Sequence, residues 1–300
     1  MANTHTFNNR LVLNQWIIHL LGVDPFQEYE VEGRKRRPFH RLKDALTRPT
    51  GSPKEGRDSD GQHHFCHDLV RSGLLDESDT GITKEDILRY EERIGSVTRR
   101  VMEAERGFKW KYFQWLCLLF AEIYLDRYFN GREQLLEDLN AFIDRFNAHW
   151  STYEDLPKYK EEDLNKVCFQ MATGSGKTLL MHANLLQFRR YAKETSAIGT
   201  FSRAILVTPN ERLSSQHVDE VRKTNGIRAA DFAVEGNSLF TQSGDLDRID
   251  VIDINKLEDD EGPTTIATRS LGDQNLLLVD EAHRGLSGSS QGDDGLGAWM

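Results

Sequence analysis

A glycine-rich segment constrains what this chain can fold into more than any other feature of its sequence. ATGSGKT occupies residues 172–178, with the apolar residues 167–172 leading into it and a helical pattern, residues 178–193, after it. Gly174 and Gly176 permit the positive backbone angles that turn N–H groups toward an anion, and the start of a helix attracts negative charge. The segment therefore predicts a strand, a phosphate-binding turn and a helix, in that order.

The residue types in this turn predict which groups would meet a nucleoside triphosphate. Lys177 is expected to reach the β- and γ-phosphates, and the Thr178 hydroxyl is expected to ligate Mg²⁺. The remaining ATP-binding positions are Thr173, Gly174, Ser175 and Gly176. The strict pattern has glycine where this chain has Met171, so a glycine-rich turn with a chance lysine stays as the alternative. By itself the turn indicates nucleotide binding and does not say what the nucleotide drives.

A second motif follows another apolar run. Residues 275–279 are apolar after the initial asparagine, and Asp280, Glu281, Ala282 and His283 come directly after them. A strand that ends in two acids would place both carboxylates at one edge of a sheet, where ligands bind. We expect Asp280 to hold Mg²⁺ through water, and Glu281 to orient or deprotonate the attacking water. The alternative is a strand that ends in an ordinary charged loop.

From residue 166 onward, short apolar runs alternate with longer helical patterns. Such alternation is typical of an α/β fold in which helices flank a parallel sheet and ligands bind beyond the carboxyl ends of the strands. Both motifs lie at such ends. The expected strands are residues 167–172, 204–208, 250–254 and 275–279, and the expected helices include residues 178–193 and 211–223.

The first 106 residues have a different pattern of apolar and polar residues, which predicts a mostly helical accessory region. Residues 10–21 have helical apolar spacing that stops at Gly22. Thr83 and Asp86 belong to a capping-box pattern that opens a helix running to about residue 106. Between these helices, the polar residues 48–61 are expected to form an exposed loop.

Two further helices are expected at residues 109–129 and 132–150, separated by Asn130 and Gly131. They connect the accessory region to the alternating part of the chain. The predicted organisation is therefore a helical accessory region, residues 1–106, followed by an ATP-binding lobe, residues 107–300.

Charge and cysteine content exclude several classes of protein. A net charge of −10 argues against a global basic field that coats nucleic acid, although the basic residues 33–37 could contact phosphates or form a solvated face. The three cysteines are widely spaced and predict neither disulfides nor a zinc ribbon. The polar residues 63–67 are interpreted as a solvated segment and not as a metal site. Because no apolar run is long enough to span a bilayer and no secretory pattern opens the chain, we expect a cytoplasmic protein without a membrane partner.

Together the two motifs resemble those of a known family of motors. ATGSGKT combined with Asp280-Glu281-Ala282-His283 resembles motifs I and II of superfamily-two DEAH-type helicases. MATGSGKT, LVTPN and LVDEAHRG are similar to the restriction-subunit-like branch, which contains the motor of type III restriction enzymes and related phage-defence helicases. The resemblance implies a P-loop NTPase with a RecA-like lobe, with ATP and Mg²⁺ as cofactors and His283 as a coupling residue. It also implies a second lobe, for which no motif follows His283.

The same resemblance implies where nucleic acid would bind. The segment Ile205-Leu-Val-Thr-Pro-Asn is similar to motif Ia of the family, whose strand end and helix start contact the nucleic-acid backbone. The resemblance implies contacts with the nucleic-acid backbone at Thr208, Pro209 and Gln216. It implies a further contact at Lys256, in the next such segment. A plain strand-to-helix turn is the alternative.

An upstream glutamine is similar to the family's aromatic-Gln element, which reads the edge of adenine. Gln114 follows Tyr112 and Phe113, and a Gln amide can both donate to adenine and accept from it. Gln114 precedes the glycine-rich turn by more residues than is usual in the family. The alternative is therefore an ordinary glutamine on a helix surface.

These observations predict the ATP-binding and ATP-hydrolysing lobe of a helicase or translocase, with DNA favoured over RNA as its partner. A non-catalytic nucleotide-binding or assembly module is the rival, as is a fragment that is inactive without its second lobe. A nuclease, a methyltransferase or a polypeptide that supplies the second lobe are further partners that the resemblance implies.

Overall fold

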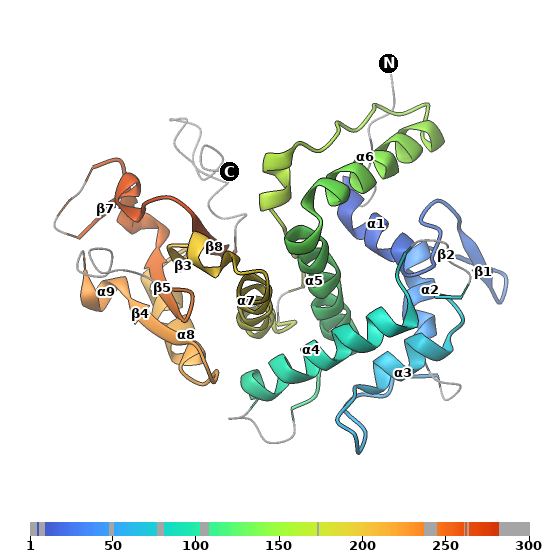
Figure 1. Ribbon diagram of the computed structural model, residues 1–300, viewed down its shortest axis with the longest axis horizontal. Helices are drawn as coiled ribbons and strands as arrows, with labels where there is room; N and C mark the ends of the chain where they lie inside the picture. The colour runs from blue at the N-terminus through green and yellow to red at the C-terminus, as the bar shows by residue number, and fades with distance from the viewer. Residues whose placement is uncertain are drawn as a thin grey trace. The chain divides into compact units, whose positions relative to one another are not determined.

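The computed structural model divides the chain into two units (Figure 1). Unit 1 comprises Met1–Val97 and Gly107–Ser175, and unit 2 comprises Thr98–Arg106 and Gly176–Met300. The structure describes residues 5, 10–47, 51–76, 81–102, 108–172, 174–236, 245–260, 262 and 264–281.

Unit 1 is mainly helical and is drawn in blue to green in Figure 1. Its helices confirm the expected helical stretches and add a short antiparallel hairpin that the sequence did not predict. In the described residues, no helix has the length and apolar composition needed to cross a membrane. The elements are α1 (Val12–Leu20), β1 (Tyr29–Val31), β2 (Arg34–Arg36), α2 (Pro38–Ala45), α3 (His64–Arg71), α4 (Lys84–Met102), α5 (Tyr112–Asn130), α6 (Arg132–His149) and the 3₁₀ turn η2 (Glu161–Asn165). The last residues of α4, from Thr98 onward, belong to unit 2.

Local contacts explain where two of these helices begin and end. At the start of α4, the Thr83 N–H donates to the Asp86 carboxylate (3.0 Å) and the Asp86 N–H donates to the Thr83 hydroxyl (3.1 Å), which confirms the capping box. After α1 the chain turns at Gly22, whose φ is +80°. A Cβ at Gly22 would lie 1.9 Å from the carbonyl oxygen of Leu74, so only glycine fits there.

The interpretation of residues 63–67 as a solvated segment is wrong. Residues His64–Arg71 form α3, and His63 and Cys66 are buried. The carboxylate of Glu91, on α4, accepts hydrogen bonds from His63 Nδ1 (2.7 Å) and from the indole N–H of Trp115 (2.9 Å). A buried carboxylate needs such donors because an unpaired charge is costly to remove from water. His63 thus supplies a hydrogen-bond donor to the buried carboxylate of Glu91.

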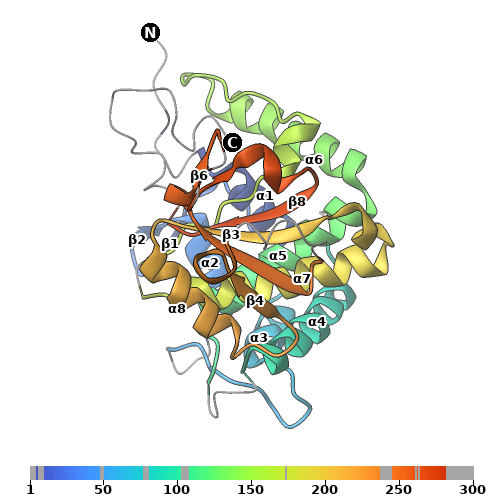
Figure 2. The ribbon, with the colours of Figure 1, turned by 90° about the vertical axis from the view of Figure 1, so that its left-hand side faces the viewer.

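Unit 2 contains a four-stranded parallel sheet in the order β4-β5-β3-β8 (Figure 2). Three of its strands confirm the expected apolar runs, while β4 was not predicted. Its strands are β3 (Arg203–Thr208), β4 (Arg228–Asp231), β5 (Arg248–Asp253) and β8 (Asn275–Val279), and a separate small pair is β6 (Leu257–Glu258) with β7 (Ile266–Ala267). Its helices are α7 (Lys177–Glu194), α8 (Glu211–Val221) and α9 (Phe232–Glu235), and its 3₁₀ turns are η3 (Ala197–Thr200), η4 (Ile254–Lys256) and η5 (Thr268–Leu271).

The core of unit 2 forms around β3, the strand that has a partner on each side. All six residues of β3 are buried, as expected for a central strand covered on both faces. Helix α8 packs against β3, β4 and β5. One group of apolar side chains, from β3, β4, α9, β5 and β7, packs together: Ile205, Val207, Ala230, Phe232, Ile252 and Ile266. This architecture is that of a RecA-like α/β lobe.

One expected strand is absent. Residues 167–172 form no strand, and the side chains of Val167 and Phe169 are 41% and 40% exposed. Among the described residues, no strand pairs with this segment, so its backbone groups have no ladder to join. The apolar sequence alone was not sufficient to make it a strand.

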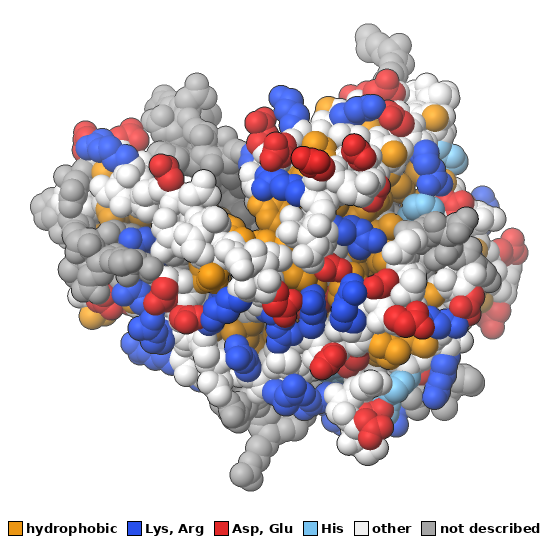
Figure 3. Space-filling model, in the orientation of Figure 1, with side chains coloured by type: hydrophobic (Ala, Val, Ile, Leu, Met, Phe, Trp, Pro, Cys, Tyr) orange, Lys and Arg blue, Asp and Glu red, His pale blue; other side chains and the backbone are white. Residues whose placement is uncertain are grey.

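The visible face in Figure 3 carries both acidic and basic side chains. Charges of both signs are thus interspersed on this face.

Candidate active site

The carboxyl end of β8 fixes the first acid of the second motif. The Asp280 N–H donates to the carbonyl oxygen of Val207 (3.0 Å), which continues the pairing of β8 with β3 by one residue. The Asp280 side chain is 12% exposed. The backbone of this residue is therefore held by the sheet, and its carboxylate lies where ligands of parallel sheets bind.

A histidine from α8 holds that carboxylate. His217 Nε2 lies 3.0 Å from Asp280 Oδ2, and the His217 side chain is only 3% exposed. This hydrogen bond is the largest cause that lowers the pKa of Asp280, and the nearby Lys177 charge acts in the same direction, whereas burial raises it. These contacts favour the ionised form of Asp280, which is the form of a carboxylate that can hold a metal ion.

The second acid pairs with the lysine of the glycine-rich turn. Lys177 Nζ lies 2.8 Å from Glu281 Oε1, and the two side chains are partly exposed. Glu281 has a φ of 51°, in the left-handed region that residues with a side chain rarely adopt. Strained backbone of this kind is common where a side chain must be aimed for function. The structure therefore brings together Lys177, Glu281 and Asp280, as the sequence predicts.

The start of α7 has the features of an anion cradle. Gly176 precedes the helix with a φ of 83°, and the first N–H groups of any helix lack partners within it. Gly174 has a φ of 74°, and a Cβ there would meet no atom within 4 Å, so it is the backbone angle that requires glycine. Ser175 Oγ is buried without a partner among the described residues. These groups fit a bound phosphate, with Thr178 in the first turn of the helix.

Gln114 is not an ordinary glutamine on a helix surface. It is 6% exposed, its amide donates to the Ser175 carbonyl oxygen (2.8 Å), and its own oxygen accepts from the Lys111 N–H (2.8 Å). Gln114 thus ties the start of α5 to the backbone of the glycine-rich turn. Its predicted contact with adenine stays a prediction.

The predicted nucleic-acid contacts lie at the ends of β3 and β5. Parallel pairing places Thr208 opposite Asp253, and the Asn255 side chain donates to the Pro209 carbonyl oxygen (3.4 Å). The Thr208 side chain is buried and shares a hydrogen bond of 2.6 Å with Ser214 Oγ. This contact stabilises the turn into α8, where Gln216 is exposed. A contact of these residues, or of the half-buried Lys256, with nucleic acid stays a prediction.

Sequence reasoning missed His217 and placed two residues where the structure gives no description. His217 falls among the buried positions of α8, so its helical spacing alone suggests a core residue. Only the crossing of α8 over the sheet brings it to Asp280. Thr173 and His283 lie outside the described residues.

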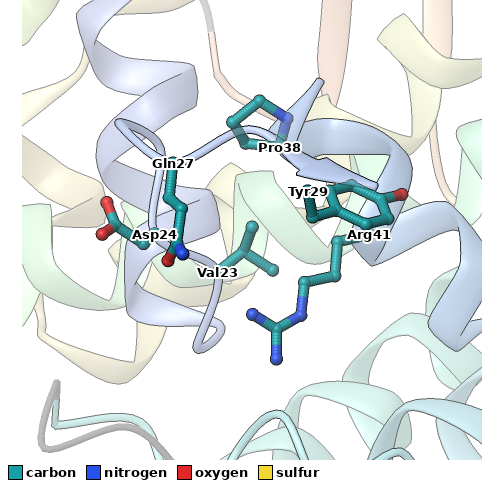
Figure 4. A pocket seen from close by; sticks show the side chains of 6 residues that line it. All are labelled: Val23, Asp24, Gln27, Tyr29, Pro38 and Arg41. Carbon is teal, nitrogen blue, oxygen red and sulfur yellow. The ribbon is translucent and has the colours of Figure 1, made fainter. Parts of the chain in front are cut away.

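A small pocket in unit 1 has no part in this site. Figure 4 shows its lining, which combines apolar and polar side chains. None of the residues around it belongs to the predicted site. They are Val23, Asp24, Gln27, Tyr29, Pro38 and Arg41.

Comparison with known proteins relates the chain to a family. The family model described as "Type III restriction enzyme, res subunit" matches residues 131–293, which include both nucleotide motifs. No curated protein and no solved structure matches the chain.

Proposed function

The chain belongs to the family of the type III restriction enzyme res subunit, and from this premise we propose that it binds and hydrolyses ATP to drive movement along DNA. The family match and the fold identify a helicase-like ATP-binding lobe of superfamily two. We propose in addition that this chain hydrolyses ATP, that its partner is DNA and that it acts in restriction or phage defence.

The observation that supports hydrolysis most directly is the convergence of Lys177, Asp280 and Glu281. Lys177, at the first position of α7, would bind the phosphates, and Thr178 with Asp280 would hold Mg²⁺. When bound, Mg²⁺ would neutralise charge on the phosphoryl group that is transferred. Lys177 would first leave the Glu281 carboxylate to bind a phosphate. Glu281 would then take a proton from the attacking water as the water oxygen bonds to the γ-phosphorus, and ADP would leave with the bridging oxygen.

The proposed nucleic-acid contacts share one edge of the sheet. Thr208 ends β3 and Pro209 follows it, Lys256 follows β5, and these strands are parallel neighbours. Backbone N–H groups at the start of α8, together with the exposed Gln216, would bind phosphates of the backbone. Such contacts do not read sequence, which suits a motor that moves along DNA.

A cytoplasmic setting is part of the proposal. The described cysteines Cys66, Cys117 and Cys168 are free, and Cys168 is exposed. A reducing compartment keeps such thiols free. A nuclease, a methyltransferase and a partner that supplies the second lobe are the proposed protein partners, on the basis of the family alone.

The test is steady-state ATP hydrolysis with duplex DNA, duplex RNA or no nucleic acid, over a range of salt concentration. We expect DNA to stimulate hydrolysis, with an effect that falls as salt rises because phosphate contacts release counterions. Lys177→Ala supplies the background rate. Lys177-dependent nucleotide binding without hydrolysis under any of these conditions would instead support the non-catalytic module.

A further inference from the structure

His217 contacts the site and has no role in the function proposed above. Its Nε2 lies 3.0 Å from Asp280 Oδ2, across 63 positions in the sequence. Its side chain is 3% exposed, so the contact is shielded from water. A hydrogen bond between a buried imidazole and an ionised carboxylate is among the stronger ones in proteins.

Both partners in this contact are positioned by β3. Asp280 is held through its N–H, which donates to Val207 in that strand. His217 is held through the turn that follows β3, where the Asn210 side chain caps α8 by accepting from the Leu213 N–H (3.0 Å). The Ser214 hydroxyl, one turn before His217, bonds to Thr208 at the end of the strand. The distance between imidazole and carboxylate is therefore set by the sheet and not by a flexible loop.

A second buried histidine, His182, interacts with His217. His182, on α7, is 1% exposed, and burial together with His217 lowers its pKa to about 4. Its Nδ1 lies 3.3 Å from the Thr224 hydroxyl. Among the described residues, His182 Nε2 and His217 Nδ1 are buried without a hydrogen-bond partner. Buried ring nitrogens without a partner are costly, which indicates that His217 is not there for packing alone.

We propose that His217 is a positioning residue, which commits one oxygen of Asp280 to its imidazole and thereby fixes the orientation in which that carboxylate holds Mg²⁺. The inference rests on the proposed function, because it assigns Asp280 to the metal. Groups that orient a metal-holding side chain affect metal affinity strongly, since without them the side chain must be ordered when the metal binds.

The experiment compares His217→Leu with His217→Gln in the full chain. Leucine removes the donor at similar volume, whereas the glutamine amide reaches about as far as imidazole Nε2 and restores a donor. The readouts are the Mg²⁺ concentration that half-saturates binding of a fluorescent non-hydrolysable ATP analogue, and the Mn²⁺ affinity measured by EPR. We expect His217→Leu to raise the half-saturating Mg²⁺ concentration and the Mn²⁺ dissociation constant by about 10- to 100-fold. Analogue binding without metal stays unchanged, and His217→Gln recovers most of the loss.

Asp219→Asn is the matched control, because Asp219 lies on the same helix with its side chain 72% exposed. It should leave both readouts unchanged. Thermal melting reports whether each variant is folded. If His217→Leu is not folded, His217→Asn takes its place, since that amide is too short to reach Asp280.

Two outcomes overturn the inference alone: an unchanged Mg²⁺ requirement in a folded variant without the donor, or an equal loss in His217→Gln. Both presuppose that the unmodified chain binds the analogue in a manner that depends on Mg²⁺ and on Lys177. If it does not, the proposed function fails, and the inference fails with it. The two failures are therefore distinguishable.

Discussion

Two apolar runs lead into the two nucleotide motifs, and their structures differ. Residues 275–279 form β8, which pairs with β3 and holds Asp280 through a backbone hydrogen bond to Val207. Residues 167–172 form no strand. An apolar run becomes a strand only where a neighbour satisfies its backbone groups. The carboxylates are thus positioned by the sheet, whereas the glycine-rich turn depends on the helix that follows it and on Gln114.

This difference predicts that the two motifs have separate roles. In the proposed function, the end of β8 carries the groups that act on water and metal, and the sheet positions these groups. The glycine-rich turn carries the groups proposed to bind phosphate. Substitutions at the end of β8 should therefore affect turnover most, and substitutions at the turn should affect binding most.

The largest expected effect is on turnover. Glu281→Gln removes the carboxylate that takes a proton from water, so ATP turnover should fall by about 10²- to 10⁴-fold. Binding of a non-hydrolysable analogue in Mg²⁺ should be retained, because Asp280 and Lys177 are unchanged. Rapid-quench hydrolysis and fluorescence binding measure the two quantities. Weakened binding with normal turnover per bound ATP would contradict the role given to Glu281.

The next effect concerns the two strands themselves. Leu206 in β3 is fully buried, whereas Leu277 in β8 is 46% exposed. Leu206→Ala should cost about 2–5 kcal/mol in the free energy of unfolding, and Leu277→Ala should cost at most roughly 1 kcal/mol. Urea denaturation measures both. Equal costs would show that the exposed side of β8 is covered in solution.

A smaller effect is expected at the turn. Lys177→Ala removes a charged donor to phosphate, which is worth about 1.5–3 kcal/mol, or roughly 10- to 100-fold in affinity for the ATP analogue. Lys193→Ala, on the same helix with a side chain 55% exposed, is the control and should bind normally. Isothermal titration calorimetry gives the affinities. Equal affinity in both variants would remove Lys177 from the phosphate site.

The smallest effect tests what Gln114 does for the turn. Gln114→Ala loses two hydrogen bonds and should weaken analogue binding by about 0.5–1.5 kcal/mol, roughly 2- to 10-fold. Gln134→Ala is the control, because Gln134 bonds to Asp138 within its own helix. If Gln114 also reads adenine, affinity should fall further for the ATP analogue than for the GTP analogue. Equal loss for both would limit Gln114 to holding the turn.

Patterns of apolar spacing predicted most of the RecA-like lobe. They gave β3, β5 and β8, because each has enough apolar residues to be buried in a sheet. They missed β4, whose sequence is Arg-Ala-Ala-Asp and whose strand structure comes from pairing with β5. The division of the chain at residues 106 and 107 stays a prediction.

Charged residues inside strands and helices are the other limit. Asp250 lies in β5 and is 1% exposed, with Arg203 (3.2 Å) and Arg248 (2.7 Å) as its partners. Burial raises the pKa of Asp250, and the two arginines oppose that change. Neither this arrangement nor the contact of His217 with Asp280 has a local signature, since each joins residues from different elements. The motifs predicted the chemistry of the site. Only the structure shows which side chains from other elements contact the buried carboxylates.

The positive φ of Glu281 places stability and activity in conflict at one position. A left-handed backbone costs a residue with a side chain on the order of 1 kcal/mol or more relative to glycine. Selection for thermal resistance alone would therefore favour glycine at position 281, and it would eliminate the proposed base. A library ranked by melting temperature should enrich Glu281→Gly, whereas a library ranked by ATP hydrolysis should discard it if Glu281 has the proposed role.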